Sequence, residues 1–200
     1  KIVSWVPNQD QAYATVAASA WEFLLTNVPT DEHGLPGFYT HSYFNPDTRE
    51  LSFNPHNPAG TNAMLTESAL EYYQYSGDAR VLTLVKNSVS YHLDHGLTTA
   101  TDNWASVPYA SYDYGNTTYA GASRGNSDGV GDGVGVIEPD KVGELGVAFV
   151  QLYKITGEQK YLTAAINAGN ALASHVRTGN ATQSPWPFRV KASDNTVKEQ

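Results

Sequence analysis

Residues 73–98 decide the fold, because their sequence, YQYSGDARVLTLVKNSVSYHLDHGLT, recurs later in the chain as residues 153–178, YKITGEQKYLTAAINAGNALASHVRT. Seven positions are identical in the two copies: Tyr73, Gly77, Leu82, Thr83, Asn87, His95 and Thr98 correspond to Tyr153, Gly157, Leu162, Thr163, Asn167, His175 and Thr178. Repeats of this kind are typical of a supersecondary unit that stacks on its neighbours, because one unit cannot bury its apolar face alone. The repeat therefore predicts stacked units.

Each copy predicts two helices joined by a tight turn. Gly77 suits the left-handed backbone just past a helix end, and Asp78 suits the position that caps the next helix. We expect one hairpin over residues 61–98 and a second over residues 140–178, with helices at about 61–75, 79–95, 140–156 and 159–176. Pro139 stands in the first turn of the third of these helices, where its missing N–H costs nothing. That helix is apolar nearly all round, which predicts an inner layer. On the helix expected at 79–95, the residues Val81, Val85, Val89 and Leu93 form an apolar row that is expected to face the core.

A further helix is expected over residues 10–28, and it has no partner in the repeat. Its apolar stripe consists of Tyr13, Val16, Ala17, Ala20 and Leu24, and it is widened by Trp21, Leu25 and Val28. Shortly after this helix, and after each hairpin, comes a cluster of proline and aromatic residues, at 36–39, 104–109 and 185–188. The repeating unit is thus helix, tight turn, helix and long aromatic loop.

Composition excludes several classes of partner. The net charge of −8 disfavours nucleic acid and an anionic membrane surface. The chain has no cysteine, so it has neither a disulfide framework nor a thiolate metal site. The apolar run at 142–155 is too short and too interrupted to span a membrane. We expect a secreted or extracellular protein, with a signal peptide removed ahead of Lys1, and glycans on the sequons at Asn116 and Asn180.

This layout resembles the six-hairpin glycosidase-like superfamily, whose members fold as (α/α)6 toroids. The resemblance rests on the units 73–98 and 153–178 and on the aromatic loops that follow them, and it covers most of the chain. It implies an all-α fold in which residues 1–200 form part of one toroid domain. Because the chain predicts only two hairpins and one unpaired helix, we expect the toroid to be incomplete here, with the remaining helices supplied by a longer chain or a partner fragment.

The tight turns and the long loops predict which face of the fold carries the functional site. Residues 76–78 and 156–158 close one end of the hairpins, so the long loops 29–58, 96–137 and 179 onward fall at the opposite end. Long loops are disproportionately functional. A site is therefore expected among these loops and at the N-termini of the inner helices.

Glu138 and Asp140 are the best candidates for catalysis, because they open an inner helix on that face. Glycoside hydrolysis needs two carboxyl groups, one protonated and one ionised. The alternative is that they cap the helix and complement its dipole.

Aromatic and polar side chains in the loops are candidates for substrate binding. Aromatic faces stack on sugar rings, and polar groups satisfy the hydroxyls by hydrogen bonds. The candidates are Trp104, Tyr109, Tyr112, Tyr114, His56, Arg124 and Trp186. The alternative is that the tyrosines pack over helix ends and that His56 holds a loop to a helix. No cofactor is expected. The run around Asp128 and Asp132 offers oxygen ligands to calcium as an alternative, although it lacks the spacing of an EF-hand.

The leading hypothesis is a secreted glycoside hydrolase that acts on a polysaccharide or oligosaccharide through carboxylate acid and base catalysis. A polysaccharide lyase or sugar epimerase on the same fold is the first alternative, and a non-catalytic glycan-binding or assembly module is the second. Fold alone does not decide among them, because toroids host many activities.

Overall fold

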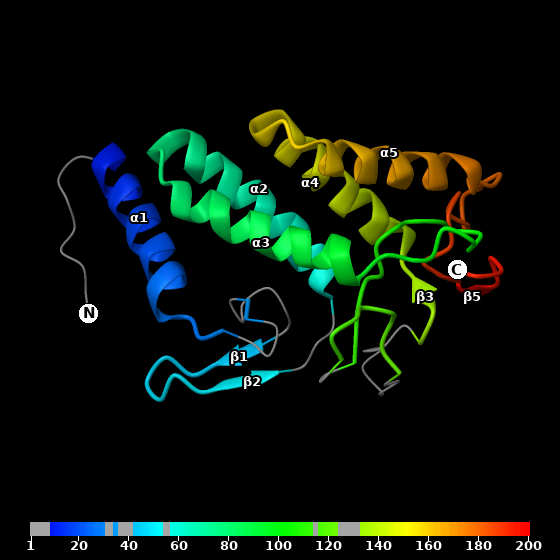
Figure 1. Cartoon of the computed structure of the whole chain (residues 1–200), viewed down its shortest axis with the longest axis horizontal. Helices are drawn as coiled ribbons and strands as arrows, with labels where there is room; N and C mark the ends of the chain where they lie inside the picture. The colour runs from blue at the N-terminus through cyan, green and yellow to red at the C-terminus, as the bar shows by residue number, and fades with distance from the viewer. Residues whose placement is uncertain (1–8, 31–33, 36–41, 54–56, 114–115, 124–132) are drawn as a thin grey trace.

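The computed structural model describes residues 9–30, 34–35, 42–53, 57–113, 116–123 and 133–200. Within these ranges the chain forms five helices: α1 (Gln9–Asn27), α2 (Pro58–Ser76), α3 (Ala79–His95), α4 (Pro139–Thr156) and α5 (Gln159–Ser174). The predicted helices are confirmed, with small differences at their ends. In Figure 1, α2 and α3 form one antiparallel hairpin, α4 and α5 form the other, and α1 lies beside the first.

The two tight turns have the predicted geometry. Gly77 and Gly157 both end their helices with a positive φ of 71°. The Asp78 side chain caps α3 by accepting a hydrogen bond from the Arg80 N–H at 3.0 Å. α2 begins earlier than expected, because the Asn57 side chain accepts from the Gly60 N–H at 3.0 Å and lets the helix start at Pro58.

The glycine turns offer a matched pair of variants. Replacing Gly157 by alanine is expected to lower the free energy of unfolding by about 1–2 kcal/mol, because a Cβ is disfavoured in the left-handed region. Gly169 lies inside α5 with open space around its Cα. Alanine there should instead stabilise the helix, by up to about 1 kcal/mol. Thermal unfolding of the two variants checks both signs. A melting temperature that rises equally in both variants would show that the left-handed backbone at Gly157 is not required.

The core lies between the hairpins. The predicted row on α3 is confirmed, since Val81, Val85 and Val89 are fully buried. α4 packs on both α2 and α5 and buries Leu145, Phe149 and Leu152, as expected for an inner helix.

The stripe expected on α1 is wrong in its first half. Tyr13 and Val16 are 63% and 57% exposed, whereas Trp21 is buried and Leu24 and Leu25 pack against the core, as expected. The reason is that α1 stands at the edge of the array, packs chiefly on α3, and stacks Trp21 on Tyr72 with ring centroids 5.6 Å apart. No helix within the described ranges has the length and apolar character needed to cross a bilayer.

Short strands form two small antiparallel sheets beside the helices. β1 (Ser42–Phe44) pairs antiparallel with β2 (Leu51–Phe53), and β3 (Val136–Ile137), β4 (Arg189–Lys191) and β5 (Val197–Glu199) form a sheet in the order β3-β4-β5. The pairing of Ile137 with Val190 fastens the C-terminal segment to the residues that lead into α4. The sequence did not predict this sheet.

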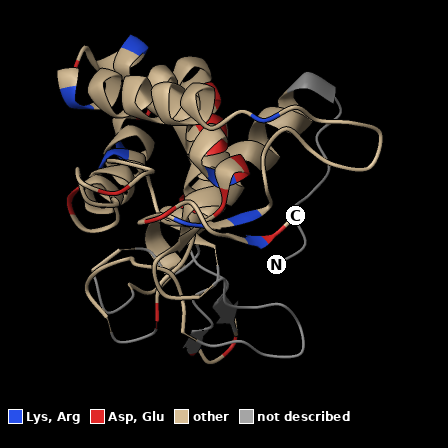
Figure 2. Cartoon of the chain, turned by 90° about the vertical axis from the view of Figure 1, so that its right-hand side faces the viewer, with Lys and Arg blue, Asp and Glu red and all other residues tan. Residues whose placement is uncertain are grey.

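The long loops lie at the opposite end of the hairpins from the tight turns, as expected (Figure 1). In the perpendicular view of Figure 2 the helices again lie above and the loops below. The N-terminus of α4 and the C-terminal sheet therefore share the loop face.

Candidate functional site

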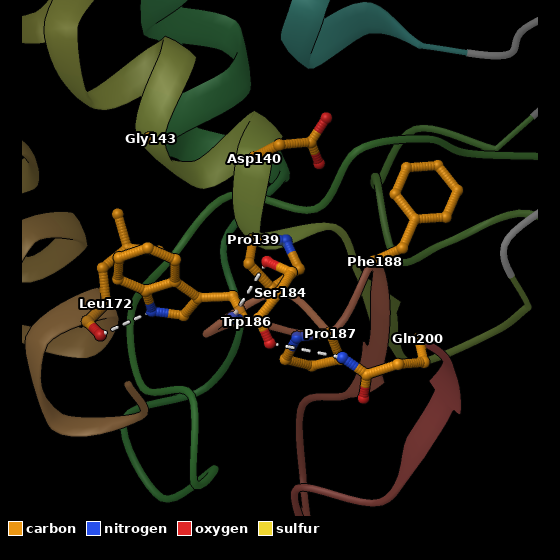
Figure 3. Close-up of a pocket in the computed structure, with 9 residues that line it drawn as sticks. All are labelled: Pro139, Asp140, Gly143, Leu172, Ser184, Trp186, Pro187, Phe188 and Gln200. Atoms are coloured by element: carbon orange, nitrogen blue, oxygen red, sulfur yellow. Dashed lines mark hydrogen bonds between the residues drawn. The ribbon is translucent and has the colours of Figure 1, made fainter. Parts of the chain in front are cut away.

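A cavity of about 480 Å³ opens on the loop face at the N-terminus of α4 (Figure 3). α4 contributes its first turn, α5 contributes Leu172, and the C-terminal segment contributes an aromatic and proline-rich wall. The lining residues are Pro139, Asp140, Gly143, Leu172, Ser184, Trp186, Pro187, Phe188 and Gln200. The cavity thus joins the predicted inner-helix N-terminus to the third aromatic cluster.

Asp140 is the carboxylate of this cavity. It lies in the first turn of α4, where the N-terminal end of the helix dipole stabilises a negative charge. Its side chain is 45% exposed, and its Oδ2 lies 3.2 Å from the Lys141 Nζ. Asp140 is therefore an accessible carboxyl group at the cavity wall, beside the Lys141 ammonium.

Lys141 links Asp140 to a second carboxylate. Its ammonium donates to both carboxylate oxygens of Glu144, at 3.0 and 3.1 Å. Burial lowers the pKa of Lys141, but the hydrogen bond to Glu144 and the charge of Asp140 outweigh burial, and the pKa lies above its usual value. The group is thus a fixed cation between two acids.

Glu138 has different surroundings from Asp140. Its side chain is only 9% exposed, and its Oε1 accepts a hydrogen bond from the Arg189 Nε at 2.9 Å. The same guanidinium donates through Nη1 to Glu199 Oε2, also at 2.9 Å. Glu138 does not line the cavity. The structure therefore separates the two predicted catalytic residues, with Asp140 at the cavity and Glu138 in a buried ion pair that joins α4 to β4 and β5.

Trp186 lies at the cavity, as predicted. Its indole N–H donates to the Leu172 carbonyl at 2.9 Å, which fixes the half-buried ring against α5. Phe188 is 41% exposed on the same wall, and the Arg189 guanidinium lies 4.8 Å from its ring centroid. A fixed indole and an exposed phenyl group can stack on sugar rings. Their binding role stays a prediction.

Trp104 and Tyr112 do not offer a face to a ligand, because both side chains are fully buried. Trp104 stacks on His175 at 4.1 Å, and its indole N–H donates to Asn195 Oδ1 at 2.9 Å. Tyr112 stacks on Tyr119 at 4.6 Å. The prediction that they bind substrate is wrong, because these aromatics close the core beneath the loops. Tyr109 is half-buried and packs against both the cluster that contains Trp104 and the cluster that contains Tyr112.

The structure does not test the remaining predicted residues that fall in its undescribed ranges. His56, Tyr114, Arg124, Asp128 and Asp132 lie outside the described residues. Among the residues that are described, no three potential metal ligands come together. Asn116 and Asn180 are both exposed, which an acceptor of a glycan requires.

Lys141 and Glu144 are charged neighbours of Asp140 that were not predicted, and neither lines the cavity. Glu144 follows Asp140 by one helical turn on α4, and this spacing could have indicated it, because residues four apart share a helix face. Glu144 lines a second groove between α2 and α4, together with Glu67 and the exposed side chains of Met64 and Val147.

Solved structures of carbohydrate-active enzymes share this fold. A family 76 glycoside hydrolase from a bovine Bacteroides thetaiotaomicron strain matches 94% of this chain and 36% of its own, with 16% identity and a TM-score of 0.57. A cellobiose 2-epimerase from Spirochaeta thermophila matches 91% of this chain and 43% of its own, with 18% identity and a TM-score of 0.61. The GH76A α-1,6-mannanase of Salegentibacter matches 88% of this chain and 44% of its own, with 24% identity and a TM-score of 0.54. A polysaccharide lyase matches as well.

These matches show that the chain shares the fold of these (α/α) toroid enzymes, and they confirm the predicted fold. The chain spans between 36% and 44% of the length of these three enzymes, so the toroid is incomplete within it. No protein-family model matches the sequence, and no curated protein matches it significantly.

The Salegentibacter mannanase also supplies a point of contrast. Its inactive variant, which was solved with α-1,6-mannotetrose, carries substitutions of two adjacent aspartates. The sequence of this chain contains no two adjacent aspartates. That pair of adjacent aspartates therefore identifies no catalytic residue in this chain.

Proposed function

We propose that this chain carries part of the active site of a secreted glycoside hydrolase that acts on an oligosaccharide or polysaccharide. The observation that carries the proposal is Asp140, an accessible carboxylate in the first turn of an inner toroid helix, on the wall of a cavity that also holds Trp186 and Phe188. Asp140 supplies one of the two carboxyl groups that glycoside hydrolysis needs, and the fixed indole and the phenyl group supply faces on which a sugar can stack.

In this proposal Asp140 acts as the base or the nucleophile, because its accessible carboxyl group lies on the cavity wall, with the Lys141 ammonium 3.2 Å from its Oδ2. Glu138 acts as a positioning residue, because its carboxylate is occupied by Arg189 and so fixes the β4 strand, which follows directly on Phe188. The role predicted for Glu138 as a second catalytic carboxylate is thereby replaced.

Further helices are part of the proposal. The groove between α2 and α4 exposes Met64 at 65% and Val147 at 59%, beside Glu67 and Glu144. Exposed apolar groups on two inner helices fit a surface that other helices of the same toroid cover. We infer that a longer chain or a partner fragment supplies them, so activity is to be assayed on the natural full-length protein.

A panel of polysaccharides and oligosaccharides tests the activity, with α-1,6-linked manno-oligosaccharides first because a fold neighbour was solved with one. Hydrolysis releases one reducing end for each glycosidic bond cleaved. A lyase also releases a reducing end, but it leaves on the other product an unsaturated uronate with ultraviolet absorbance, which hydrolysis does not form. An epimerase would change the sugar with no new reducing end. Either of those products would replace the hydrolase proposal.

Asp140→Asn is expected to lower kcat/KM at least about 100-fold while the protein stays folded, since removal of an acid or base group costs roughly 10²–10⁴-fold. Asp94→Asn is the matched control, because Asp94 is exposed near the end of the outer helix α3. Equal activity of the two variants would remove Asp140 from the mechanism, and binding of glycans with no turnover would favour a non-catalytic module.

A further inference from the structure

Four polar side chains are buried in the α2/α3 hairpin. Asn62 and Thr66 on α2, and Ser88 and His92 on α3, are all no more than 1% exposed. Within the described residues, both amide atoms of Asn62, the hydroxyls of Thr66 and Ser88, and the Nδ1 of His92 have no hydrogen-bond partner. Buried polar atoms of this kind are rare in folded proteins unless ordered water satisfies them.

The four residues form one layer of the hairpin. Asn62 and His92 stand at equal distances along the sequence from the turn glycine, Gly77, and so do Thr66 and Ser88. In an antiparallel hairpin of helices, residues at equal distances from the turn lie at the same height along the helices. By this spacing Asn62 lies level with His92, and Thr66 lies level with Ser88.

The second hairpin shows the same pairing in apolar form. At the corresponding positions of the second copy stand Val142, Gly146, Ala168 and Leu172. A Cβ placed on Gly146 would lie 3.3 Å from the Cβ of Ala168, so this pair meets across the α4/α5 interface. The repeat thus fills one layer with small and apolar groups in one hairpin and with four polar groups in the other.

The chemistry of the layer fits a small neutral molecule that both donates and accepts. The His92 Nε2 lies 3.0 Å from the Tyr109 carbonyl oxygen, so Nε2 carries the proton and donates it. Nδ1 is then an acceptor that needs a donor, since burial lowers the pKa of His92 to about 4 and keeps the ring neutral. The amide of Asn62 and the two hydroxyls offer both donors and acceptors.

We propose that Asn62, Thr66, Ser88 and His92 form a binding site for ordered water inside the α2/α3 hairpin, whereas the corresponding layer of the α4/α5 hairpin is dry. A water bound to several polar side chains satisfies groups that cannot reach solvent. The site also supports the loop face, because His92 holds the Tyr109 carbonyl and contacts Tyr119 edge-on with ring centroids 4.9 Å apart.

Water–protein cross-relaxation in NMR of the full chain tests the site directly. Long-lived water should give cross-peaks of the sign of a rigid complex to amide protons near Asn62, Thr66, Ser88 and His92. No such peaks are expected near Val142, Gly146 and Ala168, which are buried. Absence of the first set, or the same peaks in both hairpins, would overturn the proposal.

Replacing the four polar residues of the α2/α3 hairpin by apolar residues gives a second test. The quadruple variant Asn62→Val, Thr66→Ala, Ser88→Ala, His92→Leu should lose the water cross-peaks. Its loss of melting temperature should also be smaller than the sum of the four single losses, because each single variant leaves the other groups and their water behind. Ser90→Ala is the control, since the Ser90 hydroxyl already receives a hydrogen bond from Lys160. Additive losses would contradict a shared site, and if the quadruple variant fails to fold, the cross-peaks of the native chain still decide.

Discussion

An Arg189→Met variant is expected to lose about 3–5 kcal/mol of unfolding free energy, the range observed when one partner of a buried ion pair is removed. Methionine keeps the apolar stem of the side chain but removes the charge. The Glu138 carboxylate, which is 9% exposed, then loses the guanidinium that donates to it at 2.9 Å. Urea unfolding of the variant measures the effect.

Arg80→Met is the control for that result. Arg80 also makes two ion pairs, with Glu22 at 2.8 Å and Asp78 at 2.7 Å, but its side chain is 54% exposed. Exposed pairs contribute at most about 1 kcal/mol, so the control should be nearly as stable as the native chain. Similar small losses in both variants would show that the pair of Glu138 with Arg189 does not hold the C-terminal sheet on α4.

The second large effect is a dependence of stability on pH that comes from His92. Burial lowers its pKa in the folded chain from 6.5 to about 4. Between these two values only the unfolded chain binds the proton, so the unfolding free energy falls as the pH falls from about 6.5 to about 4. Each pH unit in this window contributes about 1.4 kcal/mol, which gives about 3 kcal/mol in all.

The difference between the native chain and a His92→Gln variant isolates this effect, because carboxylates contribute equally to both. That difference in unfolding free energy should shrink as the pH is lowered from 7 to 4. His95→Gln is the control, since His95 is exposed near the end of α3. A difference between native chain and variant that stays constant with pH would show that His92 is not buried in its neutral form.

The repeat predicted most of the fold because its signals are local. The glycines at 77 and 157, the cap at Asp78 and the apolar row from Val81 to Val89 act within one or two helical turns. The stripe on α1 failed at Tyr13 and Val16 because its burial depends on how α1 packs at the edge of the array, which no local pattern records. The β3-β4-β5 sheet was missed because its strands are very short and β3 lies far from β4 and β5 in the sequence.

The site was predicted by its place more accurately than by its residues. The position of Asp140 at a helix N-terminus was readable, and Trp186 followed from the third aromatic cluster. The separate environment of Glu138 was not readable, because its partner Arg189 lies 51 residues away in the sequence. Trp104 was misassigned because composition cannot distinguish an aromatic ring that binds a ligand from one that closes the core, and only its complete burial decides.

Whether the cavity at the N-terminus of α4 binds a sugar is decided by an NMR titration that follows the indole N–H signals of tryptophan. The chain has four tryptophans, of which Trp186 lines the cavity whereas Trp104 is fully buried elsewhere and Trp21 lies on α1. Titration of the natural protein with the oligosaccharide that it cleaves should shift the Trp186 signal and leave those of Trp104 and Trp21 in place. An unmoved Trp186 signal at a saturating sugar concentration would show that the sugar binds elsewhere.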